Sequence, residues 1–175
     1  GDFPSQIQKK FPAAQILCLD YPGFGAATKA EIPWTIESMR IFVNKALQSH
    51  LRKFPELQKA PKLLFAISLG GMVALDWLSQ KSQPFAASVI INSSLGSLNP
   101  PYQRIQPKAM LALSQSAVDP NIRRREARIL GIVSNFANRT AEALPLWTQL
   151  AESQQSTSQI RRQAMIQQLA AAARF

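Results

Sequence analysis

The sequence has few of the residues that build metal centres and disulfide frameworks. Its 175 residues include one Cys, Cys18, and one His, His50. A single Cys excludes a disulfide framework and a thiolate metal cluster, and it fits a reducing compartment such as the cytoplasm. A single His excludes most His-rich metal sites, so we expect neither a metal nor another cofactor. Catalysis that depends on a His must use His50 or a residue outside this sequence.

Long apolar runs and a recognisable leader are also missing. No stretch approaches the roughly 18 uninterrupted apolar residues that a membrane span needs. The start, Gly1-Asp2-Phe3-Pro4, has no Met and no signal pattern, so we expect a piece of a longer protein or a processed product. Apolar residues nevertheless make up 46% of the sequence, which is an ordinary share for a globular domain with its own core.

Short apolar runs alternate with helical patterns in residues 1–98. The pattern predicts buried strands at 16–19, 63–67 and 87–91, and helices at 35–54 and 69–80. Such an alternation predicts right-handed crossovers and a parallel sheet with helices on both faces. The fold class is therefore α/β in this half of the chain.

No convincing strand follows in residues 99–175. Helical patterns lie at 105–116, 121–138, 141–152 and 157–173, after the break at Pro100-Pro101. The last pattern opens with Ser-Thr-Ser-Gln at 156–159, which has the form of a capping box. This half is predicted to be an all-helical subdomain.

The motif that carries chemistry follows the strand predicted at 63–67. That strand runs into Ile67-Ser68-Leu69-Gly70-Gly71, and an apolar helix begins at once. A Ser at the apex of such a turn is held in a strained conformation, and the residues two before and two after it must be small. Ala66 and Gly70 meet that demand. Ser68 is thus a candidate nucleophile, and the backbone N–H of Leu69 is a candidate oxyanion donor at the positive end of the helix.

Other readings of these glycine-containing segments are weaker. A lone S-x-G-G also occurs at ordinary helix starts, but the preceding apolar strand favours the nucleophile interpretation. Gly23-Phe24-Gly25 is no dinucleotide loop, because Thr28 stands where the third Gly is required. The sequence also contains no G-x-x-x-x-G-K pattern of a phosphate-binding loop.

Three segments follow one another in a recognisable order: Leu19-Asp20-Tyr21-Pro22-Gly23-Phe24-Gly25, Ala66-Ile67-Ser68-Leu69-Gly70-Gly71 and Ile90-Ile91-Asn92-Ser93-Ser94. Together they resemble the α/β-hydrolase superfamily, and in particular its small acyl-ester carboxylesterases, which include the pimeloyl-carrier methyl ester esterases. The resemblance implies a serine hydrolase acting on a small-molecule ester or related acyl substrate. It also implies a partial hydrolase core over residues 1–98 and a helical cap or lid over residues 99–175.

The resemblance also shows which parts are absent. The family's order is nucleophile, acid, His, but no His follows Ser68. The place after the third predicted strand reads Asn92-Ser93-Ser94, and the next acidic residue is Asp119, in the cap. His50 shares a helical face with apolar residues, so we expect it to pack rather than to act as a base; these residues are Ile36, Met39, Val43, Leu47 and Phe54.

The resemblance further implies a strand and a His-Gly loop before residue 1, with the strand lying between those at 16–20 and 62–67. The loop would supply the second oxyanion donor. We therefore expect the middle of a larger hydrolase, with both ends missing and the acid and His beyond Phe175. Such a chain should be poorly stable and inactive by itself.

Positive charge exceeds negative charge by ten, and Arg123, Arg124 and Arg125 form the one dense cluster. The cluster fits a solvated cap face, or the docking of an acidic partner such as a carrier protein bearing an acyl ester. Nucleic-acid binding is not expected, because no recognition motif is present.

A non-catalytic hydrolase-like binding module is the alternative to an enzyme. Met110, Leu111 and Leu113 are candidates for pocket lining or core packing.

Overall fold

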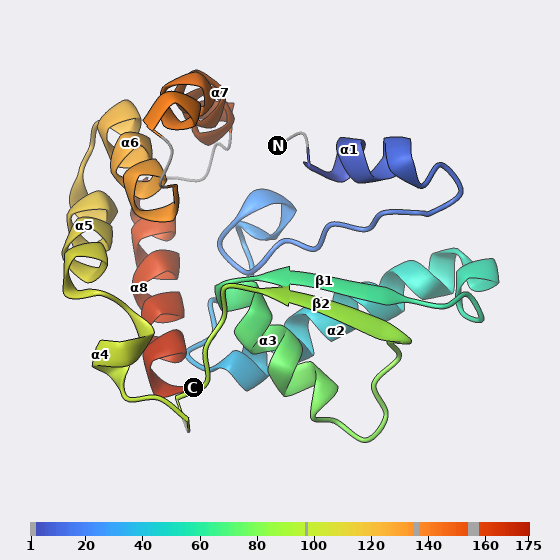
Figure 1. The fold of residues 1–175 in the computed structure, drawn as a ribbon. Helices are drawn as coiled ribbons and strands as arrows, with labels where there is room; N and C mark the ends of the chain where they lie inside the picture. Colours follow the sequence, from blue (N-terminus) through green and yellow to red (C-terminus); the bar gives the residue numbers. More distant parts are fainter. Residues whose placement is uncertain (1–2, 97, 135–136, 154–157) are drawn as a thin grey trace. The chain divides into compact units, whose positions relative to one another are not determined.

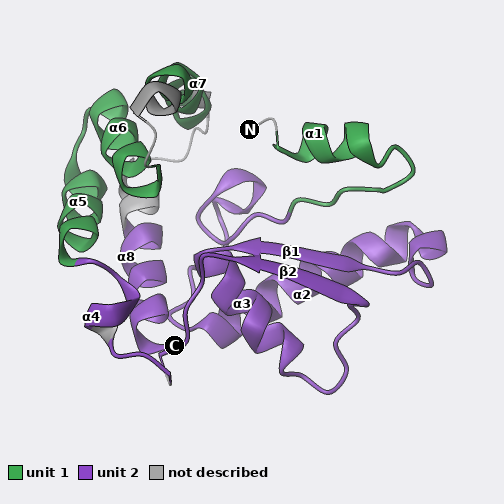
Figure 2. Ribbon diagram, in the orientation of Figure 1, with its two compact units in different colours: residues 1–18, 107–155 green, residues 19–106, 156–175 purple. Residues whose placement is uncertain are grey.

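A computed structural model of the chain describes residues 3–96, 98–134, 137–153 and 158–175. The chain forms two compact units, shown in Figure 2: residues 1–18 with 107–155, and residues 19–106 with 156–175. The boundaries of these units differ from the predicted boundary at residue 98. For example, the last helix, α8 (Ser158–Arg174), follows residue 98 but belongs to the second unit. The division into a hydrolase core and a cap at that residue remains a prediction.

A small parallel sheet lies at the centre of the second unit. Strands β1 (Leu63–Ile67) and β2 (Ala87–Ile91) pair in parallel, with Leu63 opposite Ala87 and Ile67 opposite Ile91 (Figure 1). Helix α3 (Leu69–Leu78) connects them, and α2 (Ile36–Lys53) precedes β1. The shorter elements are η1 (Gly25–Ala27), η2 (Pro55–Leu57) and α4 (Pro101–Arg104). Two of the predicted strands and their parallel pairing are confirmed.

The strand predicted at 16–19 is wrong. These residues have no regular secondary structure, and β1 pairs with β2 alone in the two-stranded sheet. An apolar run becomes a strand only when a neighbour pairs with its backbone N–H and C=O groups. No such neighbour lies beside these residues in the described part of the chain, and Leu17 is 38% exposed.

The core of this unit lies between α2 and α3. Its buried side chains come from both helices: Ile36, Met39, Val43, Leu47, Leu51, Val73 and Trp77, joined by Ala171 of α8. The predicted apolar face of α2 is confirmed except at Phe54, which is 38% exposed because the helix ends at Lys53. Thr35 caps the start of α2 by accepting a hydrogen bond of 3.1 Å from Ser38 N–H.

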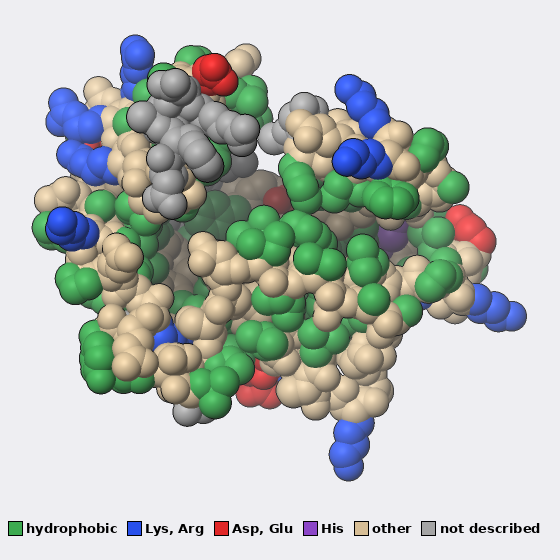
Figure 3. Space-filling model, in the orientation of Figure 1, with side chains coloured by type: hydrophobic (Ala, Val, Ile, Leu, Met, Phe, Trp, Pro, Cys, Tyr) green, Lys and Arg blue, Asp and Glu red, His purple; other side chains and the backbone are tan. Residues whose placement is uncertain are grey.

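Only one face of the sheet is covered by helices within this unit. Helix α3 packs against both strands, and α2 packs against α3. Side chains of the opposite face are between 37% and 66% exposed: Leu63, Phe65, Ile67, Val89 and Ile91. They form part of the apolar surface over β1 and β2 in Figure 3. The expectation of helices on both faces is therefore wrong for the described residues, since a single crossover helix covers a single face.

The first unit is helical. It contains α1 (Phe3–Lys10), α5 (Pro107–Val118), α6 (Ile122–Val133) and α7 (Ala137–Ser153), and α6 packs against α5 and α7. The helical patterns predicted at 105–116, 141–152 and 157–173 correspond to α5, α7 and α8 with shifts at their ends. The pattern predicted at 121–138 is too long, because α6 ends at Val133 and residues 137 and 138 belong to α7. Helices α1 and α4 were not predicted. Part of the predicted capping box, residues 156 and 157, lies outside the described residues.

Met39 is fully buried in the core of the second unit. Met39→Ala should lower the free energy of unfolding by about 2–5 kcal/mol, because it removes buried methylene groups and leaves a cavity. Met110→Ala is the matched control, since Met110 is 51% exposed and the same atoms are removed. Chemical denaturation measures both variants, and equal losses would contradict this description of the core.

Candidate functional site

Ser68 lies between the end of β1 and the start of α3 with an unusual backbone conformation. Its φ is 53° and its ψ is −120°. For a residue other than Gly, such angles cost on the order of 1–3 kcal/mol and persist only where the surroundings enforce them. This is the strained apex that the strand–turn–helix pattern predicts.

The end of β2 holds the backbone of Ser68 in place. Ser68 N–H donates to Ile91 O at 3.0 Å, which extends the ladder of the sheet by one residue. Ser93 Oγ donates to Ser68 O, also at 3.0 Å. The same oxygen accepts the first helical hydrogen bonds of α3, from Gly71 N–H at 2.9 Å and Met72 N–H at 3.3 Å. Both backbone polar groups of Ser68 are therefore satisfied, and its conformation is tied to the sheet.

The first turn of α3 presents free donors next to Ser68. The N–H groups of Leu69 and Gly70 have no hydrogen-bond partner among the described residues, and the Ser68 side chain does not cap the helix. Unpaired N–H groups at a helix start carry partial positive charge and attract negative oxygen atoms. Ser68 therefore lies at the partly positive start of α3, directly before two N–H groups that have no partner among the described residues.

A close approach at Gly71 was missed by the sequence reasoning, which assigned the small-residue requirement to Ala66 and Gly70. A Cβ at Gly71 would lie 2.5 Å from Ser93 Cβ and 2.9 Å from Ile90 Cγ2. A Cβ at Gly70 would meet only Tyr21 Oη, at an ordinary 3.5 Å. Gly71 is therefore the residue that lets α3 pack against the end of β2. The Gly-Gly pair in the motif was the signal for this contact.

The loop at residues 20–25 lies beside this turn. Asp20 Oδ2 accepts a hydrogen bond of 3.0 Å from Ala26 N–H, which closes the loop around Gly25 with its positive φ of 50°. Tyr21 packs against the core, and burial raises the pKa of its phenol to about 12. The phenol is therefore neutral at physiological pH, with its oxygen near Gly70.

His50 does not meet Ser68. Its ring packs against Phe54 in a tilted arrangement with 4.8 Å between centroids, and its Nε2 is buried without a hydrogen-bond partner in the described structure. His50 lies near the end of α2, which leads through η2 to the start of β1, whereas Ser68 follows the end of β1. The structure brings no His to the nucleophile.

The two places considered for an acid from the sequence lie in different units of the chain. Asn92 follows β2 with a positive φ of 52° and is exposed. Asp119 belongs to the first unit, where the hydrogen bond from Asn121 N–H (2.9 Å) and the ion pair with Arg128 hold the pKa of its carboxyl below the usual range. Its role there is to organise the start of α6.

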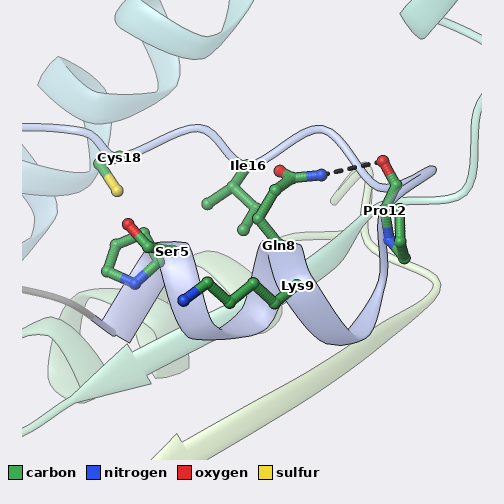
Figure 4. A pocket seen from close by; sticks show the side chains of 7 residues that line it. Ser5, Gln8, Lys9, Pro12, Ile16 and Cys18 are labelled. Atoms are coloured by element: carbon green, nitrogen blue, oxygen red, sulfur yellow. Dashed lines mark hydrogen bonds between the residues drawn. The ribbon is translucent and has the colours of Figure 1, made fainter.

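A hollow in the first unit has a volume of about 520 Å³ (Figure 4). It lies between α1 and the segment that follows it and is lined by Pro4, Ser5, Gln8, Lys9, Pro12, Ile16 and Cys18. Gln8 Nε2 donates to Pro12 O at 2.9 Å, and the Cys18 thiol is exposed.

The described residues contain no group of three His, Cys, Asp or Glu side chains suited to a metal ion.

Three residues of α5 were candidates for a pocket or the core. Met110 and Leu111 are 51% and 60% exposed, so core packing is wrong for them, while Leu113 is half-buried.

Among the helices of the described residues, none has the length and apolarity that crossing a membrane requires.

A parallel β–α–β unit with a strained Ser at the strand-to-helix turn defines an α/β protein of the hydrolase type. The sequence model of the alpha/beta hydrolase family matches residues 2–174, and the chain belongs to this family. Searches of curated proteins and of solved structures found no significant match.

Gly71→Ala tests the contact between the first turn of α3 and the end of β2. The added Cβ overlaps Ser93 and Ile90, and overpacking of this kind should cost about 1–3 kcal/mol of unfolding free energy. Gly131→Ala is the matched control, because nothing lies within 4 Å of a Cβ there and α6 should gain up to about 1 kcal/mol. Denaturant titration measures both variants; a neutral Gly71→Ala would show that the close approach is absent.

Proposed function

We propose that this hydrolase-family chain carries the nucleophile of a serine hydrolase, Ser68, which acts on a carboxylic ester or related acyl substrate. The observation that supports the proposal most strongly is the positive φ of Ser68 at the junction of β1 and α3. A non-Gly residue in this conformation is a marker of function when its surroundings enforce the strain. Hydrogen bonds to Ile91 and Ser93 do so here.

The proposed reaction proceeds through an acyl-enzyme. Ser68 Oγ attacks the substrate carbonyl carbon, its proton passes to a His base, and the negative oxygen that develops accepts a hydrogen bond from Leu69 N–H. Collapse of this intermediate expels the alcohol, which takes the proton back from the His. Water then attacks the acyl-enzyme in the same way and releases the carboxylic acid. We propose that the His and its acid partner follow residue 175, so the chain alone is inactive.

The remaining parts of the proposal concern the substrate and its surroundings. We assign the helices after residue 98 to a cap that walls the substrate site, and apolar residues on them favour an acyl group. The protein is proposed to be a cytoplasmic carboxylesterase-type enzyme, in line with the single exposed Cys18, which indicates a reducing compartment.

A fluorophosphonate probe tests the nucleophile in the complete gene product. We expect stoichiometric labelling of the wild type and no labelling of Ser68→Ala, because the probe reacts with an activated Ser hydroxyl. Ser114→Ala is the matched control, since Ser114 is exposed on α5 and its Oγ donates only to Met110 O. Labelling that persists in Ser68→Ala would contradict the assignment, and a complete gene product without labelling would favour the non-catalytic binding module.

A second candidate, docking of an acidic partner, is favoured by the charges on α6. Helix α6 carries four Arg side chains, and two of them form ion pairs in the described structure, Arg125 with Glu126 and Arg128 with Asp119. The other two form no ion pair among the described residues, although the charge of Arg124 still acts on the carboxyl of Asp119. These two, Arg123 and Arg124, are exposed. An acidic carrier protein bearing an acyl ester would find its complement there.

The docking proposal predicts a salt-dependent association that depends on two residues. Replacing Arg123 and Arg124 together by Gln should weaken binding to an acidic carrier protein about tenfold or more at low salt, and high salt should remove most of the difference. Lys9→Gln with Lys10→Gln on α1 is the control with an equal loss of charge. Isothermal titration calorimetry measures both pairs, and equal weakening by both would indicate a net-charge effect without a docking surface.

A further inference from the structure

Ser93 contacts the backbone of the nucleophile from the end of the neighbouring strand. Its Oγ donates a hydrogen bond of 3.0 Å to Ser68 O, a residue 25 positions earlier. Its Cβ lies against Gly71, where an added Cβ would approach to 2.5 Å. Asn92, with a φ of 52°, turns the chain after β2 immediately before Ser93. The hydroxyl of Ser93 is therefore held beside the Ser68 turn by its hydrogen bond to Ser68 O and by the packing of Ser93 against Gly71.

The hydrogen bond of Ser93 acts on the peptide group that contains the oxyanion donor. Ser68 C=O and Leu69 N–H belong to one planar peptide unit and point in opposite directions. A contact that fixes the direction of the carbonyl therefore fixes the direction of the N–H. A donor on the carbonyl also polarises the peptide, which strengthens its N–H as a donor by about 10–30%.

The other donors to Ser68 O cannot replace this contact. Gly71 N–H and Met72 N–H belong to the first turn of α3, so they move with the helix. Within the described residues, the hydroxyl of Ser93 is the one side-chain donor to this oxygen, and Ser93 lies two residues after the end of β2. It joins the peptide to the sheet, while the two N–H groups join it to the helix.

We propose that Ser93 is a positioning residue for oxyanion stabilisation: by holding Ser68 C=O, it aims Leu69 N–H at the carbonyl oxygen of the acyl substrate. The inference rests on the proposed hydrolase function. Ser93 acts through the Ser68–Leu69 peptide and makes no contact with the substrate. Its removal should therefore destabilise the transition state, in which the substrate carbonyl oxygen is negative, more than the ground state, in which this oxygen is neutral.

Ser93→Ala in the complete gene product should lower kcat for a small ester about tenfold and leave KM within about twofold. Complete loss of an oxyanion donor costs about 10²–10³ in kcat, and misdirecting a donor costs part of this. The affinity for an alkyl boronic acid, whose Ser68 adduct has a negative oxygen at the same place, should fall by a similar factor. Ser93→Cys has a weaker donor of similar shape, so its kcat should lie between the two.

The control is Ser82→Ala, at an exposed Ser in the turn after α3, and it should leave kcat and boronate affinity unchanged. A kcat of Ser93→Ala equal to that of the wild type overturns the inference, as does a loss of boronate affinity no larger than the change in KM. Thermal unfolding midpoints are compared for each variant, and we expect small changes because Ser68 O keeps its two backbone donors in the absence of Ser93 Oγ.

A second measurement is independent of activity. In the 175-residue chain, the amide resonance of Leu69 should shift in Ser93→Ala and stay in place in Ser82→Ala, because the first variant alone changes the Ser68–Leu69 peptide. An unchanged Leu69 resonance overturns the positioning role even if Ser68 is reactive. If the wild-type gene product shows no labelling at Ser68, the proposed function fails, while the Leu69 resonance still decides whether Ser93 orients this peptide.

Discussion

The pairing of β1 with β2 is the constraint on which the candidate site depends. The register that places Ile67 opposite Ile91 also brings Ser68 N–H to Ile91 O and Ser93 Oγ to Ser68 O. A strained residue persists only when its surroundings over-determine it, and these two hydrogen bonds supply that restraint. A shift of one residue in the register would remove both contacts and turn the side chains of β2 to the other face.

Packing of α3 on the sheet is the second part of the same constraint. Gly71 has no side chain where Ser93 and Ile90 press against the helix, so the first turn of α3 approaches the end of β2 closely. This approach places the free N–H groups of Leu69 and Gly70 next to Ser68. The core between α2 and α3 then anchors the helix, with the ion pair of Arg40 and Asp76 (2.6 Å) joining the two helices beside the core.

Local chemistry explains which elements could be predicted. Helices α2 and α3 and strands β1 and β2 follow from apolar periodicity, and Ser68 follows from the small residues around it. The strand expected at 16–19 was wrong because its apolar pattern is local, whereas strand formation needs a pairing partner that the described structure does not place beside it. The prediction of helices on the second face of the sheet was wrong for a related reason. The alternation of strands and helices along the chain does not say how many helices pack on each face.

The sequence by itself determined the fold class, the candidate nucleophile and the shortage of His and acidic partners after Ser68. These features depend on residue type and on spacing within a few residues. Only the tertiary structure decided that Ser93 bonds to Ser68 O, that Gly71 is the close approach, and that Arg125 and Arg128 form ion pairs with Glu126 and Asp119. Each of these is a contact between particular atoms, and such contacts exist only after the strands pair and the helices pack. For His50 the two agree: the sequence predicted packing instead of catalysis, and the fold places its ring against Phe54 at the end of α2.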